Sequence, residues 1–110
     1  MKYEIKMEHR ISKRVYSRIQ QFYYNVILKY PNTYSYKDAE RDKNNVISEL
    51  RKVGISLIPS NTTLPKWKGY NVCRSKLTNW YFAYKIQNDT VYIYDAENGN
   101  NMSDKAYDPL

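Results

Sequence analysis

The 110-residue sequence is poor in the residues that build several common kinds of functional site. Its only cysteine is Cys73, which excludes an intramolecular disulfide framework and a cysteine-rich zinc cluster. It has three glycines and no glycine-rich phosphate loop. No apolar run approaches the length of a membrane span, and the first ten residues lack the apolar centre of a signal peptide. We therefore expect a cytoplasmic protein with no metal, no cofactor and no membrane contact.

Basic residues and tyrosines are abundant. The chain has 18 Lys and Arg against 11 Asp and Glu, and thirteen tyrosines. Residues 1–30 carry seven basic and two acidic side chains, and residues 61–94 carry five and one. Residues 95–110 reverse the balance, with one basic and four acidic side chains. This asymmetry favours a nucleic-acid partner, and tyrosine offers flat rings for base stacking or for a protein interface.

The first thirty residues predict a strand followed by a helix. Residues 2–7 alternate apolar and charged side chains, which is typical of a strand. From His9 or Ser12 to Tyr30, apolar residues recur at spacings of three and four, which predicts an amphipathic helix. Pro31 ends this helix.

A second helix is predicted from Ser35. Ser35 and Asp38, three residues apart, resemble a capping box, and Gly54 suits the C-terminal cap. The polar face of this helix mixes both signs of charge. Residues 55–58 extend into a strand edge or a loop.

Three further strands are predicted in the C-terminal half, at Trp67–Arg74, Trp80–Ile86 and Thr90–Ala96. Turns join them at residues 75–79 and 87–89. The whole chain is therefore predicted to form an α+β protein, in which two N-terminal helices pack on one face of a small antiparallel sheet. The predicted order of elements along the chain is β-α-α-β-β-β. We expect one domain over residues 1–97, a polar tail over residues 98–110, and an open second face of the sheet.

Residues 66–94, which hold these strands as far as Tyr94, carry five cations and one acidic residue, Asp89, at a turn. An open sheet face with cations and tyrosines suits a polyanion with flat bases, which indicates RNA or DNA. The basic residues concerned are Lys66, Lys68, Arg74, Lys76 and Lys85.

The same region resembles the RelE/ParE superfamily of bacterial toxins from toxin–antitoxin modules. Residues 66–74 (KWKGYNVCR) are similar to the lysine pair and the "Y-x-x-x-R" strand of that family. Residues 80–86 resemble its "Y-R-x-x-Y" strand, and residues 91–94 resemble its closing strand. The resemblance implies a small plasmid-stabilising toxin neutralised by a cognate antitoxin. One branch cleaves mRNA on the ribosome, and the other inhibits DNA gyrase.

The resemblance also implies site residues. Lys66 and Lys68 match the lysine pair, Arg74 the strand arginine and Tyr107 the late tyrosine, and these four form the predicted catalytic set of a metal-independent endoribonuclease. If Lys66 and Lys68 share one strand face, each can depress the pKa of the other. The residues expected to contact nucleic acid are Lys76, Tyr81 and Lys85.

Two departures from the family pattern leave the function open. Tyr81 stands where the family has an arginine, and no arginine occurs near Ser103. The only histidine, His9, is expected to be exposed at a helix start, and no glutamate falls within the three predicted C-terminal strands. Cys73 is expected to be a packed thiol. A mRNA endonuclease, a gyrase inhibitor and a non-catalytic RNA- or protein-binding relative therefore all stay possible.

The partner expected from the resemblance is an antitoxin with an acidic segment. Such a partner needs an exposed sheet edge or an apolar groove beside the helices. We expect Tyr16, Tyr23 or Tyr24 to lie half covered beside that groove.

Overall fold

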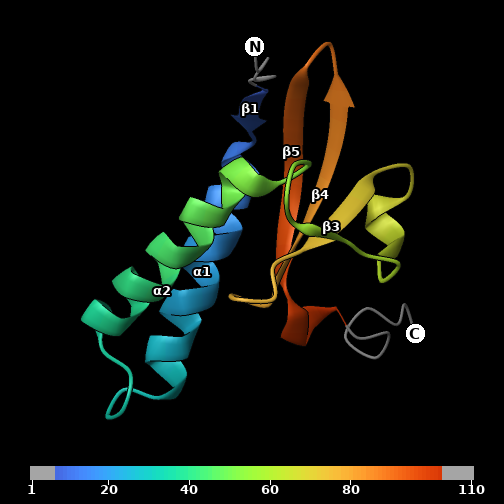
Figure 1. Cartoon of the computed structure of the whole chain (residues 1–110). Coiled ribbons are helices and arrows are strands. Elements are labelled where there is room, and N and C mark those ends of the chain that lie inside the picture. The colour runs from blue at the N-terminus through green and yellow to red at the C-terminus, as the bar shows by residue number, and fades with distance from the viewer. Residues whose placement is uncertain (1–6, 103–110) are drawn as a thin grey trace.

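The computed structural model describes residues 7–102 and shows an α+β fold in which two helices lie on one side of a five-stranded sheet (Figure 1). The predicted α+β class and both predicted helices are confirmed. The elements in chain order are β1 (Glu8–Ile11), α1 (Lys13–Lys29), α2 (Tyr36–Glu49), β2 (Ile58–Pro59), β3 (Asn71–Arg74), β4 (Trp80–Gln87) and β5 (Thr90–Asn98).

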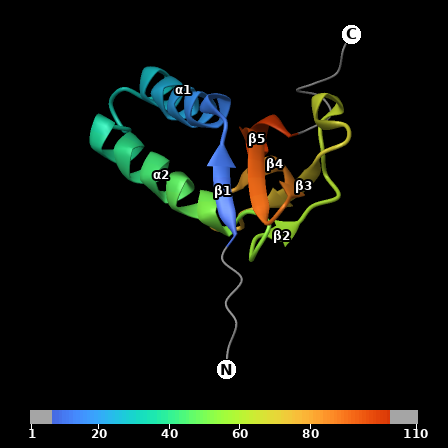
Figure 2. The same ribbon diagram turned by 90° about the horizontal axis from the view of Figure 1, so that it is seen from above.

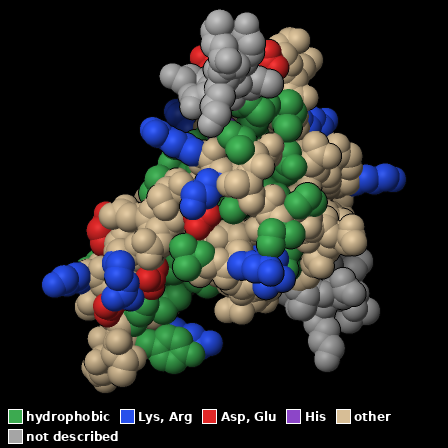
Figure 3. All heavy atoms as spheres, viewed as in Figure 1, with side chains coloured by type: hydrophobic (Ala, Val, Ile, Leu, Met, Phe, Trp, Pro, Cys, Tyr) green, Lys and Arg blue, Asp and Glu red, His purple; other side chains and the backbone are tan. Residues whose placement is uncertain are grey.

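Local side-chain hydrogen bonds start both helices. The Ser12 hydroxyl accepts a hydrogen bond from the Arg14 backbone at the start of α1. At α2 the predicted capping box is confirmed, because Ser35 and Asp38 bond each other's backbone N–H groups. The hydrogen bonds from Ser35 also hold the pKa of Asp38 below its ordinary value. Figure 3 shows basic and acidic side chains intermixed over the helical layer, as predicted for α2.

The sheet is mixed, so the prediction of a purely antiparallel sheet is wrong. The strand order is β1-β5-β4-β3-β2, and all neighbours are antiparallel except β1 and β5. These two strands run parallel, with Glu8 opposite Thr90 and Ile11 opposite Ile93. Residues about eighty positions apart make this pairing, and no local pattern in either strand encodes its direction.

Two strand boundaries also differ from the predicted ones. The predicted first strand, residues 2–7, lies outside the described residues except for Met7, and β1 follows it at residues 8–11. β3 begins at Asn71, whereas the corresponding predicted strand begins at Trp67. Pro65–Trp67 forms a 3-10 turn instead, because proline suits the first position of a helical turn, and Gly69 then reverses the chain at a φ of 89°.

The main core lies between the helices and the sheet. Trp80 is fully buried there, donates a hydrogen bond to the Tyr23 hydroxyl at 2.9 Å, and meets Phe22 edge-on. Tyr23 is therefore buried, contrary to the expectation that it is half covered. Tyr16 and Tyr24 are 42% and 44% exposed, as expected.

The second face of the sheet is open only in part. Residues 59–70 pass over it opposite the helices (Figure 2), and a smaller apolar cluster fills the space between. Met102 is buried in this cluster, so residues 98–102, predicted as the start of a tail, pack against the sheet. The members of the cluster are Leu64, Trp67, Val72, Tyr81, Ala83 and Met102.

Among residues 7–102, neither helix combines the length and the apolar character that crossing a bilayer requires.

Candidate functional site

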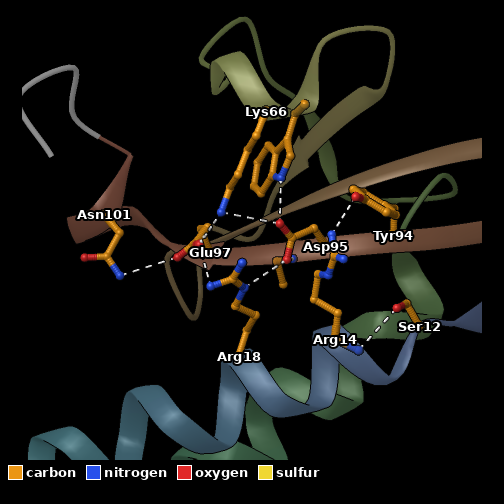
Figure 4. Close-up of polar contacts among 10 residues, drawn as sticks. Ser12, Arg14, Arg18, Lys66, Tyr94, Asp95, Glu97 and Asn101 are labelled. Carbon is orange, nitrogen blue, oxygen red and sulfur yellow. Dashed lines mark hydrogen bonds and ion pairs between the residues drawn. The ribbon is translucent and has the colours of Figure 1, made fainter. Parts of the chain in front are cut away.

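A buried carboxylate lies near the end of β5, on the second face of the sheet. Asp95 is fully buried. Its carboxylate accepts hydrogen bonds from Arg18 Nε at 3.3 Å and from Trp67 Nε1 at 2.9 Å. It also forms an ion pair with Lys66 Nζ at 3.5 Å. Figure 4 shows that Arg18 reaches β5 from α1, whereas Lys66 approaches from the opposite side. Three parts of the chain therefore meet at one carboxylate.

Glu97 lies next to Asp95 and shares its cations. Its Oε1 atom is 2.8 Å from Lys66 Nζ and 3.8 Å from Arg18 Nη1, and Asn101 donates to its other oxygen at 3.5 Å. Arg18, Lys66, Asp95 and Glu97 are called the carboxylate cluster below. Two positive and two negative charges balance within it, which is the condition under which buried charges are tolerated.

A β-bulge in β5 puts both carboxylates on this face. Ala83 of β4 is opposite Asp95, but the next residue of β4 is opposite Ile93, so Tyr94 is an extra residue in β5. Before the bulge, Ile93 faces the helices. After it, Asp95 and Glu97 face the other way, and without it they would face the apolar core.

Sequence reasoning missed this pair because it ended the strand at Ala96, before Glu97, and assigned no role to Asp95. β5 continues to Asn98. The signal was present in the alternation Asp95-Ala96-Glu97, which extends the period-two pattern of the strand.

A surface hollow of about 440 Å³ opens between α1 and the end of β5. It is called the α1–β5 hollow. Arg14 and Arg18, one helical turn apart, line one wall, and Glu97 and Asn101 line the other. Phe22 and Trp80 also contribute to its lining. Glu97 is thus at once part of the carboxylate cluster and part of a surface hollow with two arginines.

Stacked tyrosines lie next to the hollow. The rings of Tyr70 and Tyr94 are parallel within 10° and their centroids are 4.6 Å apart. Lys85 Nζ lies 4.6 Å from the Tyr70 centroid, and Arg14 Cζ lies 4.7 Å from that of Tyr94. Arg14 also donates a hydrogen bond to the Tyr94 hydroxyl (Figure 4). Arg14 therefore joins the hollow to the aromatic stack.

The two predicted catalytic lysines do not lie in a strand. Lys66 belongs to the 3-10 turn and reaches the carboxylate cluster, whereas Lys68 follows that turn. Their predicted placement on one strand face is wrong, because the residues before Asn71 are not in a strand. The predicted Tyr107 lies outside the described residues.

The other predicted residues divide between the two ends of the sheet. Tyr81 of β4 is opposite both Arg74 of β3 and Glu97 of β5. The Cα atoms of Arg74 and Glu97 are therefore two strand spacings apart, or about 10 Å. The Arg74 guanidinium lies 5.6 Å from the Tyr81 ring centroid. Lys85 lies toward the opposite end of the face, and Lys76 is exposed in the turn between β3 and β4.

His9 is part of the fold, contrary to the expectation that it is exposed at a helix start. It lies in β1, and its Nε2 atom is 2.9 Å from the Val53 carbonyl oxygen. Cys73 is fully buried, as expected for a packed thiol, and burial raises the pKa of its thiol to about 12.

Cys73 is therefore expected to resist alkylation while the chain is folded, because only the thiolate reacts and burial disfavours it. With iodoacetamide at pH 8, mass spectrometry should show an unmodified thiol in the native protein. In urea the same thiol should react fully. Rapid labelling of the native protein would contradict this account.

Among residues 7–102, no three His, Cys, Asp or Glu side chains come close enough together to hold a metal ion. No family model, no curated protein and no solved structure matches this chain.

Proposed function

We propose that this chain is a toxin-like endoribonuclease of the RelE/ParE type that cleaves mRNA at the ribosome, with the α1–β5 hollow as its reactive centre. The observation that carries the proposal is the position of Glu97. Its carboxylate faces a hollow lined by Arg14 and Arg18 and lies 2.8 Å from Lys66 Nζ. The order of one strand, two helices and the strands β3, β4 and β5, preceded by the two-residue strand β2, agrees with the resemblance and supports the proposal. A cognate antitoxin and a cytoplasmic location belong to it as well.

The residues of the hollow, together with Lys66 beside Glu97, suit cleavage through the RNA 2′-hydroxyl. Glu97 accepts the 2′ proton as the 2′-oxygen attacks phosphorus. Arg14 and Arg18 stabilise the negative charge on the phosphorane. The bond from phosphorus to the 5′-oxygen then breaks, and this oxygen takes its proton from the Lys66 ammonium group. The products are a 2′,3′-cyclic phosphate and a 5′-hydroxyl end.

A non-catalytic RNA-binding protein is the second candidate, and a specific observation favours it. Arg18 and Lys66 already form ion pairs with Asp95 and Glu97. A cluster whose charges balance is suited to holding α1 and residues 65–67 against β5. RNA would then bind to the exposed cations nearby without being cleaved.

Expression in a bacterial host tests the proposal. We expect growth arrest and mRNAs truncated within translated regions, with 5′-hydroxyl ends detected by ligation-based sequencing. Growth arrest with intact mRNA and altered DNA supercoiling would indicate gyrase inhibition instead. Normal growth together with RNA binding in vitro would indicate the non-catalytic candidate. Co-expression of a short neighbouring gene should restore growth if it encodes the antitoxin.

A further inference from the structure

The open part of the second sheet face carries a row of cation, tyrosine and cation. Arg10 of β1 is opposite Tyr92 of β5, and Tyr92 is opposite Lys85 of β4. Tyr92 is 41% exposed, although its strand, β5, has a neighbouring strand on each side. The three side chains belong to three adjacent strands, so the backbone ladder holds them at fixed spacing.

This row forms one side of a second hollow, also of about 440 Å³. The stacked pair Tyr70 and Tyr94 lines its other side, so three tyrosine rings surround it. Among residues 7–102, its charged lining residues are Arg10 and Lys85, and no carboxylate lines it. Arg10 forms an exposed ion pair with Glu8 at 3.9 Å.

We infer that this second hollow binds unpaired nucleotides of a single nucleic-acid strand, with a base against Tyr92 and phosphates near Arg10 and Lys85. Aromatic rings exposed between cations are the elements with which proteins hold single strands without reading their sequence. An acidic peptide would satisfy the cations, but it has no flat group to place against an exposed ring in a tyrosine-lined hollow.

The position of the second hollow relative to Glu97 fits a single bound strand. Both lie on the same face of β5, and their partners on β4, Lys85 and Tyr81, are four residues apart, so Tyr92 and Glu97 are separated by roughly 13 Å. Arg14 lines the first hollow and contacts Tyr94, which lines the second. The inference rests on the proposed function for the identity of the strand as RNA, and the second hollow then holds nucleotides flanking the cleaved bond.

Binding of a fluorescein-labelled single-stranded RNA oligonucleotide, followed by anisotropy with the full chain, tests the inference. Tyr92→Ala should weaken binding about tenfold, the loss expected for one base–aromatic stack. Tyr92→Phe should bind within about twofold of the unmodified chain, because the ring stays. Lys85→Gln should reduce the slope of log affinity against log salt by about 0.7, as expected for one lost phosphate contact.

Tyr36→Ala is the matched control, because Tyr36 is an exposed tyrosine on α2, away from the sheet face. Equal affinity of the Tyr92→Ala and Tyr36→Ala variants would overturn the inference, even if the chain cleaves RNA. Binding of an oligoglutamate peptide that depends on Tyr92, with no binding of RNA or DNA, would also overturn it. Tyr92-dependent binding of RNA that stays uncleaved, or of single-stranded DNA alone, would support this site and contradict the proposed function.

Discussion

Glu97→Gln is expected to lower the rate of RNA cleavage by roughly 10²–10⁴-fold, the usual contribution of a positioned general base. The amide keeps the size of the side chain, and its oxygen can still accept the hydrogen bond from Lys66, whereas its NH2 group replaces the oxygen that accepts from Asn101. It cannot take the proton of a 2′-hydroxyl. The measurement is single-turnover cleavage of mRNA by the purified protein with ribosomes, at equal concentrations of folded protein.

Glu40→Gln is the control for this experiment. Glu40 is exposed on α2, where it pairs with Lys43, so its loss removes the same charge far from the sheet face. We expect unchanged cleavage from this variant. Full activity of Glu97→Gln would exclude Glu97 as the base and assign the carboxylate cluster to structure alone. Circular dichroism and thermal unfolding must show that both variants are folded before their rates are compared.

Asp95→Ala is expected to destabilise the fold by about 3–5 kcal/mol, because it leaves the buried Trp67 N–H without its acceptor and the carboxylate cluster with an uncompensated positive charge. Arg18, Lys66 and the Trp67 indole all direct N–H groups at this carboxylate. The cost should appear in the free energy of unfolding measured in urea. A variant that is mostly unfolded at 25 °C would agree with the upper part of this range.

Two comparisons show whether the lost stability comes from the uncompensated charge. Glu40→Ala removes an exposed ion pair and should cost less than about 1 kcal/mol. Combining Asp95→Ala with Lys66→Met should recover part of the stability, because the carboxylate cluster then again holds one cation, Arg18, and one carboxylate, Glu97. A double variant as unstable as the sum of the two single changes would contradict this explanation.

The sequence by itself determined the elements whose causes are local. Ser35 and Asp38 are close enough along the chain to build the capping box of α2. Apolar side chains at spacings of three and four predict α1, and Ser12 supplies its N-terminal cap. The turn before β5 follows from Asn88 and Asp89, which adopt positive φ angles more readily than most residues. Each of these features depends on residues within a few positions of one another.

The tertiary structure alone decided where the candidate site lies. One extra residue at Tyr94 turns Asp95 and Glu97 away from the apolar core, and this bulge exists only in the pairing of β4 with β5. The cations that compensate them come from Arg18 and Lys66, which are 77 and 29 positions from Asp95. A local pattern indicates which face of a strand is apolar. It carries no information about which distant charge reaches that face, because this depends on how the layers pack.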